Sequence, residues 1–206
     1  MWCKCLIAVL FFFPQLSKAQ NKKEQFIKAG VIAGINFSQV DGDCFAGYDK
    51  FGLNIGATAF IKFHKNWSIG FELDYSQKGS RQDIPPDHSY LPYKIKIDYL
   101  DVPLMLSVHD KRNNMFSAGL SYGTLMRHKE FQDGAEIQDD PFLKFKNTDL
   151  NFVAGVTFFV WEEKFGFNLR GAYSLIPIRF ANCTGVTTRG VYNNYLSVRF
   201  LYLFNN

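Results

Sequence analysis

The stretch "NWSIGFELDYSQKG", residues 66–79, alternates apolar and polar side chains almost without exception. Successive side chains of an extended strand point to opposite faces, so every second residue shares a face. The apolar face carries Trp67, Ile69, Phe71, Leu73 and Tyr75. The polar face carries Ser68, Gly70, Glu72, Asp74 and Ser76. Such a strand must place one face against an apolar phase, which is either the protein's own core or a lipid bilayer.

The length and composition indicate one all-β domain. The chain has 206 residues, which such a domain can reach undivided. Aromatic residues make up 17% of the chain, charged residues make up 20%, and no run of Lys and Arg exceeds two residues. These features argue against a nucleic-acid binder and against a disordered acidic chain, so we expect no nucleic-acid partner.

The beginning of the chain has the pattern of an export signal. Lys4 supplies a positive charge, an apolar run (LIAVLFFF) covers residues 6–13, and small residues flank a cleavage site at 17–19 (SKA). This apolar run is too short to cross a bilayer as a helix, which takes about 20 residues. We predict a signal peptide at residues 1–19 and an outer-membrane β-barrel domain at 20–206. The alternative is a buried N-terminal strand.

The alternation of the opening stretch recurs along the chain. Seven further segments follow it: 29–38, 51–63, 93–109, 116–123, 150–160, 165–175 and 196–204. The segment 93–109 changes phase, because Ile95 and Ile97 lie on the face opposite to Leu104. We predict a β-bulge near Asp98–Leu100 that returns these apolar side chains to one face.

The connections between the segments alternate in length. Short ones are predicted at 64–66, 110–114 and 162–164, and long polar ones at 39–50, 79–92, 127–146 and 177–190. Short periplasmic turns and long extracellular loops are typical of outer-membrane β-barrels. An even number of strands then places both termini of the chain on the periplasmic side, with the short turns.

The composition of the polar face favours lipid as the apolar phase. The polar face of a water-soluble sandwich meets solvent, where Lys and Glu are abundant. Here this face consists mainly of Gly, Ser, Asn and Thr, which suit a narrow barrel interior, and aromatic residues lie near the strand ends. We predict an all-β fold, an eight-stranded antiparallel up-and-down transmembrane β-barrel. A soluble barrel or sandwich is the alternative.

Three stretches carry a family resemblance: "GVIAGINFS" (30–38), "SIGFELDYSQKGS" (68–80) and "IKIDYLDVPLMLSV" (95–108). They resemble the PorT-like, or "porin family", outer-membrane β-barrel domain of Gram-negative bacteria, above all in the "YSxKG"-like and "YLxxP" motifs. The resemblance implies a location in the cell outer membrane, contact with outer-membrane lipid, and no assigned activity.

The end of the chain departs from that family in one respect. Such barrels commonly finish on an aromatic residue, whereas Asn205 and Asn206 follow Phe204 here. The segment 200–204 (FLYLF) still resembles a barrel-assembly signal. We therefore expect the C-terminal strand to be recognised by the barrel-assembly machinery.

Three functional hypotheses follow from this architecture. Side chains just fill the interior of an eight-stranded barrel, so we expect a plugged lumen and no wide pore. The first hypothesis is a structural or surface-interaction role through the extracellular loops, with an unknown ligand or protein as partner. A second hypothesis is an outer-membrane enzyme for acyl transfer or proteolysis, although its candidate residues show no triad spacing: Asp83, Asp87, His88, His128 and Glu130. A third is a soluble lipocalin-type barrel, although the Gly-x-Trp of that family's first strand is missing. We expect no catalytic site, cofactor or metal, because the four His have no paired Cys/His spacing.

A cluster of charged side chains is predicted inside the barrel. Five residues fall near mid-height on the polar face: Glu72, Asp74, Asp101, Arg170 and Arg199. We predict that these three acids and two bases pair in the lumen, because an unpaired buried charge is costly. The alternative is separate solvation by trapped water.

Two cysteines remain once the predicted signal peptide is removed. Cys44 lies in the first long loop and Cys183 in the last. Closure of the barrel makes these loops neighbours, and export passes through an oxidising periplasm. We predict a disulfide between them. Two separate loop thiols are the alternative.

Overall fold

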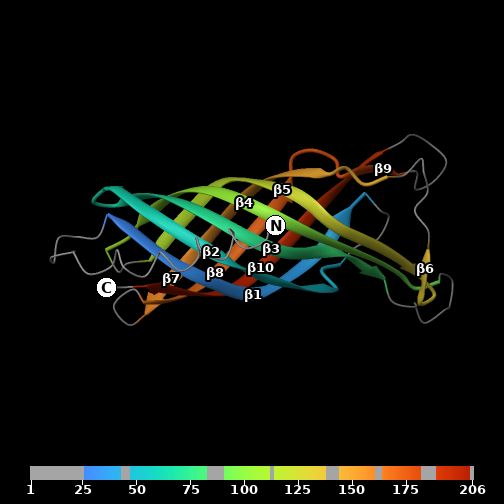
Figure 1. Ribbon diagram of the computed structural model, residues 1–206, viewed down its shortest axis with the longest axis horizontal. Coiled ribbons are helices and arrows are strands. Elements are labelled where there is room, and N and C mark those ends of the chain that lie inside the picture. The colour runs from blue at the N-terminus through green and yellow to red at the C-terminus, as the bar shows by residue number, and fades with distance from the viewer. Residues whose placement is uncertain are drawn as a thin grey trace, which may run out of the picture.

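The computed structural model describes residues 26–42, 47–82, 91–111, 114–137, 144–160, 164–181 and 189–204. These residues form one long barrel of tilted antiparallel strands (Figure 1). None of them belongs to a helix long and apolar enough to span a membrane. The predicted signal peptide at 1–19 lies outside the described residues.

Eight long strands close the barrel, as predicted. They are β1 (Ile27–Asp41), β2 (Lys50–His64), β3 (Trp67–Gln82), β4 (Tyr93–His109), β5 (Met115–Gln132), β7 (Thr148–Val160), β8 (Phe165–Ser174) and β10 (Arg189–Phe204). Each pairs with its neighbour along the chain, and β1 pairs with β10 to close the sheet, from Ala29 opposite Phe204 to Asp41 opposite Tyr192. Two short strands, β6 (Ala135–Ile137) and β9 (Arg179–Ala181), add to β5 and β10.

The two faces of the opening stretch meet different surroundings. In β3, Phe71 and Leu73 are 47% and 51% exposed, whereas Glu72 and Asp74 are 5% and 2% exposed. The same pattern holds in the other long strands, so apolar side chains cover the outside and most of the polar side chains of the strands point inside. A protein whose large apolar residues point outward in a continuous belt requires an apolar solvent, which is the bilayer.

The two ends of the barrel differ as the sequence predicts. The start of β1 and the end of β10 lie beside each other at the end that carries the short turns, and β6 and β9 lie at the opposite end (Figure 1). At this opposite, long-loop end the strands extend further than predicted. The β5 strand continues to Gln132 and β10 begins at Arg189, so the predicted loops at 79–92, 127–146 and 177–190 are too long. The prediction was wrong there because apolar alternation stops where the strands leave the lipid, while backbone pairing continues.

The predicted bulge in β4 is also wrong in its strand. Asp98 of β4 pairs with Arg127 of β5 and Tyr99 pairs with Leu125, so the additional residue, Met126, lies in β5. Strand β4 therefore keeps one phase throughout. Ile95 and Ile97 stay inside the barrel and are fully buried, instead of turning to the lipid.

Candidate functional site in the barrel lumen

Four of the predicted charged residues meet in the middle of the lumen. The Arg170 guanidinium makes two parallel hydrogen bonds to the Glu72 carboxylate, 2.8 Å from Nη1 to Oε2 and 2.7 Å from Nη2 to Oε1. Arg199 Nη1 lies 3.0 Å from Glu72 Oε2 and 3.2 Å from Asp74 Oδ2. The second side of the Arg199 guanidinium donates to Asn168 Oδ1, 2.9 Å from Nε and 2.8 Å from Nη2. We call Glu72, Asp74, Arg170 and Arg199 the arginine cluster.

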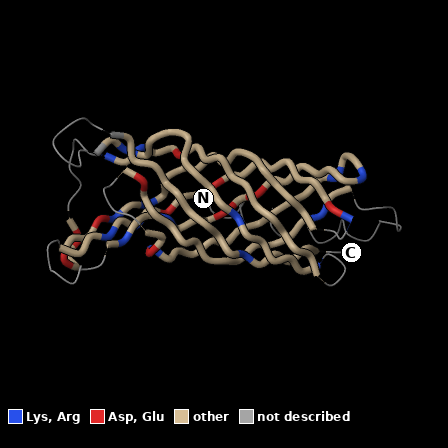
Figure 2. Tube along the Cα trace, turned by 180° about the vertical axis from the view of Figure 1, so that it is seen from behind, with Lys and Arg blue, Asp and Glu red and all other residues tan. Residues whose placement is uncertain are grey.

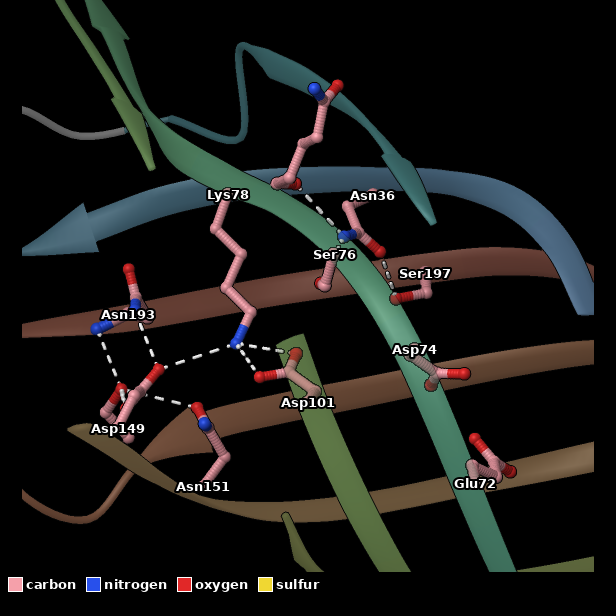
Figure 3. A network of polar contacts seen from close by, with 12 residues as sticks. Asn36, Glu72, Asp74, Ser76, Lys78, Asp101, Asp149, Asn151, Asn193 and Ser197 are labelled. Atoms are coloured by element: carbon pink, nitrogen blue, oxygen red, sulfur yellow. Dashed lines mark hydrogen bonds and ion pairs between the residues drawn. The ribbon is translucent and has the colours of Figure 1, made fainter. Parts of the chain in front are cut away.

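The fifth predicted residue, Asp101, belongs to a second group. Its Oδ2 atom lies 3.0 Å from Lys78 Nζ, which also lies 3.4 Å from Asp149 Oδ2 (Figure 3). The Lys78 ammonium lies 4.7 Å from the ring centres of both Tyr99 and Tyr195, so cation–π contacts hold it from two sides. We call Lys78, Asp101 and Asp149 the lysine cluster.

Neutral polar side chains complete the lysine cluster. Asp149 Oδ1 accepts a hydrogen bond from Ser174 Oγ at 2.7 Å, and Asp149 Oδ2 accepts one from Asn193 Nδ2 at 2.8 Å. These bonds join β7 to β8 and β10. They satisfy the Asp149 carboxylate, which has no exposure to solvent. A charged group is kept inside a protein only when hydrogen bonds or ion pairs compensate it in this way.

A hydrogen-bonded chain of neutral residues crosses the seam of the barrel. Ser197 Oγ of β10 donates to Asn36 Oδ1 of β1 at 2.7 Å, and Asn36 Nδ2 donates to Ser76 Oγ of β3 at 2.9 Å (Figure 3). Three strands are therefore tied together at one height, including the first and last of the barrel.

Sequence reasoning missed Lys78 and Asp149, although a signal for both was present. Lys78 follows Ser76 by two residues, and Asp149 precedes Asn151 by two, so both continue the inward phase of their strands. The side chains of the opening stretch were assigned to faces only as far as Ser76, and the predicted segment 150–160 begins one residue after Asp149, so neither residue was assigned to a face.

Apolar layers lie above and below the two charged clusters. At the short-turn end the lumen holds a buried group of five residues: Ile32, Phe60, Met115, Leu201 and Leu203. At the long-loop end it holds another group: Val40, Ile95, Ile97, Tyr99, Phe145, Ile178 and Val191. Above this second layer the buried Arg179 guanidinium pairs with Glu130, which also accepts the hydroxyl hydrogen of Tyr93.

The residues considered for catalysis are not assembled into a triad where they are described. Glu130 is bound by Arg179 and Tyr93, and the His128 ring packs against Phe145 with ring centres 5.0 Å apart. No group of three or more His, Cys, Asp or Glu in the described part of the chain is placed to hold a metal ion. Three of the catalytic candidates and both predicted disulfide cysteines lie outside the described residues: Asp83, Asp87, His88, Cys44 and Cys183.

A closed antiparallel barrel with an apolar outside and an ion-paired inside defines an outer-membrane β-barrel protein. Comparison with known protein families identifies the family to which the chain belongs. The family described as "Outer membrane protein beta-barrel domain" matches residues 18–179, so the chain belongs to that family. Its location is therefore the outer membrane, and the soluble lipocalin-type alternative is wrong. The narrower PorT-like resemblance stays a prediction.

Among the solved structures, that of Ail shows the same fold. Ail, the attachment invasion locus protein of Yersinia pestis, is 14% identical, with 87% of this chain and 100% of that one covered and a TM-score of 0.53. Neisserial surface protein A is 11% identical, with 87% and 98% covered and a TM-score of 0.47. No curated protein matches the chain.

Proposed function

We propose that this protein is a non-enzymatic, non-conducting outer-membrane barrel that acts at the cell surface through its extracellular end. The observation that carries the proposal is the pairing of Glu72 with Arg170. These residues belong to β3 and β8, which are third and seventh in the order of the eight strands and so face each other across the barrel. Their ion pair therefore spans the lumen.

The energetics of the arginine cluster support a closed lumen. A passage for ions requires the Arg170 and Arg199 guanidinium groups to leave the Glu72 carboxylate. Breaking a buried pair of this kind costs about 3–5 kcal/mol, because it leaves an uncompensated charge. Two apolar layers add to the obstruction, so an open state is rarely populated.

Conductance across a planar lipid bilayer tests the closed lumen. The refolded wild-type protein is expected to give no discrete current steps. The Glu72→Ser, Arg170→Ser, Arg199→Ser variant lacks the ion pairs that span the lumen, and Glu72 leaves no unpaired carboxylate behind. This variant is expected to leak more ions than the wild type does. Wild-type steps as large as those of a water-filled porin would overturn the proposal.

Accessibility in intact cells tests the surface role. The long-loop end is assigned to the cell exterior, and the barrel-assembly machinery is proposed to insert the chain through β10. A Lys129→Cys variant, near the end of β5, is expected to react with a membrane-impermeant maleimide on intact cells. A Lys65→Cys variant in the turn between β2 and β3 is expected to react only after permeabilisation, and the reverse order would contradict the proposal.

A further inference from the structure

The lipid-facing surface of the barrel contains an apolar groove. It has a volume of about 800 Å³ and extends from Phe116 of β5 across β7, β8 and β10 to Phe37 of β1. Its floor is formed by Ala154 of β7 and Gly171 of β8, which contribute only a methyl group and a hydrogen atom. Arg170 also lines the groove although its side chain points into the lumen, so part of the floor is bare backbone. We call this space the apolar groove.

Larger side chains bound the floor on both sides. In the next row toward the short turns, Val156 of β7 lies opposite Leu169 of β8. In the next row toward the long loops, Phe152 lies opposite Tyr173. Each row is displaced from the floor by two residues, which is about 7 Å along a strand. The floor therefore lies between two ridges, and the space between them suits a single extended hydrocarbon chain.

A side chain from outside the strands closes the end of the groove nearest the long loops. Tyr48 lies between β1 and β2, and its hydroxyl donates to Asn194 Oδ1 of β10 at 2.9 Å. Because β1 lies between β2 and β10, this hydrogen bond holds the tyrosine across the outside of β1. The preceding residue is also held, since the Gly47 N–H donates to Gln39 Oε1 at 3.0 Å. The groove therefore has a hydrogen-bonded wall at this end.

The surroundings of the groove require an apolar occupant. Figure 2 shows Lys, Arg, Asp and Glu gathered mainly toward the two ends of the barrel, with few between them. Phe116, Leu169 and Leu196, which line the groove, are 56%, 40% and 49% exposed and belong to the lipid-facing belt. An empty space in this belt would leave the side chains around it without van der Waals partners. The groove is continuous with the surface that meets lipid, so acyl chains are the groups within reach.

The slope of the groove argues against a second copy of the chain as the occupant. The strands are tilted to the long axis of the barrel (Figure 1), and the groove runs across them, so it is also inclined to that axis. Copies inserted in the same direction are related by a rotation about the membrane normal. Such a rotation makes the inclined rows of two facing copies cross each other. A ridge of a second copy therefore cannot lie along the groove, whereas a flexible acyl chain can follow it.

We infer that the apolar groove binds one acyl chain of a membrane phospholipid and holds it more tightly than the surrounding lipid is held. Van der Waals packing drives this binding, because acyl chains elsewhere in the bilayer are as apolar as the groove, and small residues allow close approach to the backbone. The side chains that face the groove are apolar apart from the Tyr48 hydroxyl, which Asn194 already binds. The groove therefore selects the chain and not the head group. The inference needs only the membrane location, so it does not depend on the orientation of the barrel or on a closed lumen.

Native mass spectrometry of the full-length protein in detergent, with dipalmitoyl phosphatidylethanolamine as the probe, tests this inference. The wild-type protein is expected to retain a single phospholipid. The Ala154→Phe variant places a ring on the floor of the groove and is expected to bind the probe roughly tenfold more weakly, because the chain loses its contact with the backbone. The matched control is Ala57→Phe, which adds the same ring at an outward position of β2, opposite Val31 of β1, and is expected to bind as the wild type does. Heat-modifiable gel migration verifies that both variants are folded barrels.

Two further lipids separate the chain from the head group. Dihexanoyl phosphatidylethanolamine keeps the head group but has short chains, and it is expected to bind roughly tenfold more weakly than the probe, because fewer carbon atoms contact the groove. Dipalmitoyl phosphatidylglycerol keeps the chains but changes the head group, and it is expected to bind as the probe does.

Three results would overturn the inference. The first is equal binding of the probe by the Ala154→Phe and Ala57→Phe variants. The second is binding that follows the head group and not the length of the chain. The third is a wild-type dimer that Ala154→Phe dissociates, which would assign the groove to a second copy of the chain. None of these results bears on the closed lumen, because both substituted residues lie on the outside of the barrel.

Discussion

Arg199 is the residue on which most of the central lumen depends. It is 1% exposed and contacts Glu72, Asp74 and Asn168, which come from two other strands. Arginine suits this position, because its planar guanidinium can serve three acceptors at once and keeps its charge when buried. Its removal leaves Asp74 with a single cation, Arg170 Nη1, 3.9 Å away.

We predict that Arg199→Leu lowers the free energy of unfolding by about 3–5 kcal/mol, because Glu72 and Asp74 lose a buried counter-charge. Urea unfolding of the refolded protein in detergent micelles measures the change. The control is Ser121→Ala, because Ser121 is also fully buried in the lumen and its hydroxyl has no hydrogen-bond partner in the described structure. Equal unfolding midpoints for the two variants would show that the ion pairs do not stabilise the barrel.

The position of Lys78 illustrates how far residue-level reasoning reaches. Alternation along β3 assigns Lys78 to the inward face with Glu72 and Asp74, and this could have been read from the sequence. That Lys78 lies between Asp101 and Asp149 could not, because those residues belong to β4 and β7 and meet it only through the closed sheet. Contacts between distant strands cannot be read from alternation within one strand, which also explains why the sequence analysis grouped Asp101 with Arg170 and Arg199.

At the scale of the strand, Met126 decides which side chains enter the upper lumen. It is the additional residue of β5 opposite the Asp98–Tyr99 bond, and it changes the phase of the strand beyond it. Before it, Ser121 and Gly123 are buried and face inward. After it, His128 and Glu130 lie opposite the buried Ile97 and Ile95 and face inward with them. The bulge therefore brings Glu130 within reach of Arg179 and leaves the side chains of Arg127 and Lys129 exposed on the outside.

We predict that deleting Met126 turns Glu130 outward, because a shift of one residue moves every following side chain to the opposite face. The Glu130–Arg179 pair is then lost, and Arg127 and Lys129, which are exposed in the wild type, turn toward the lumen. Trypsin is therefore expected to cleave after these two residues several times more slowly in the otherwise folded barrel. Timed proteolysis followed by mass spectrometry measures the cleavage. Met126→Ala, which keeps the residue count, is expected to be cleaved at the wild-type rate. Identical cleavage of the deletion variant and the wild type would contradict this role for the bulge.

At the scale of the whole molecule, the pairing of β1 with β10 closes the barrel. It joins the first and last strands over thirteen residue pairs and places Asp41 opposite Tyr192. The segments that lead to Cys44 and Cys183 therefore leave the barrel from neighbouring strands. This adjacency supports the predicted disulfide, although both cysteines lie outside the described residues.

We predict that mass spectrometry of the unreduced protein finds the Cys44 and Cys183 peptides linked. The bridge would close a loop of about 140 residues, for which the entropy lost by the unfolded chain corresponds to about 4–5 kcal/mol. Reduction, or the Cys44→Ser variant, is expected to lower the unfolding midpoint. The control is Cys3→Ser, which lies in the predicted signal peptide and is expected to leave the midpoint unchanged. Two freely alkylated thiols in the exported protein would exclude the bridge.

The sequence by itself determined the class of this protein. Lipid on one side and a crowded lumen on the other impose a period of two on every spanning strand, and a period is a local property that a sequence displays directly. From this period followed the number of strands, the short turns and the outward direction of the apolar side chains among residues 67–75. Only the tertiary structure decided which charges meet, where the bulge lies and how far the sheet rises above the membrane. Each of these depends on the register between strands that are distant in sequence, and alternation within a single strand carries no information about register with the others.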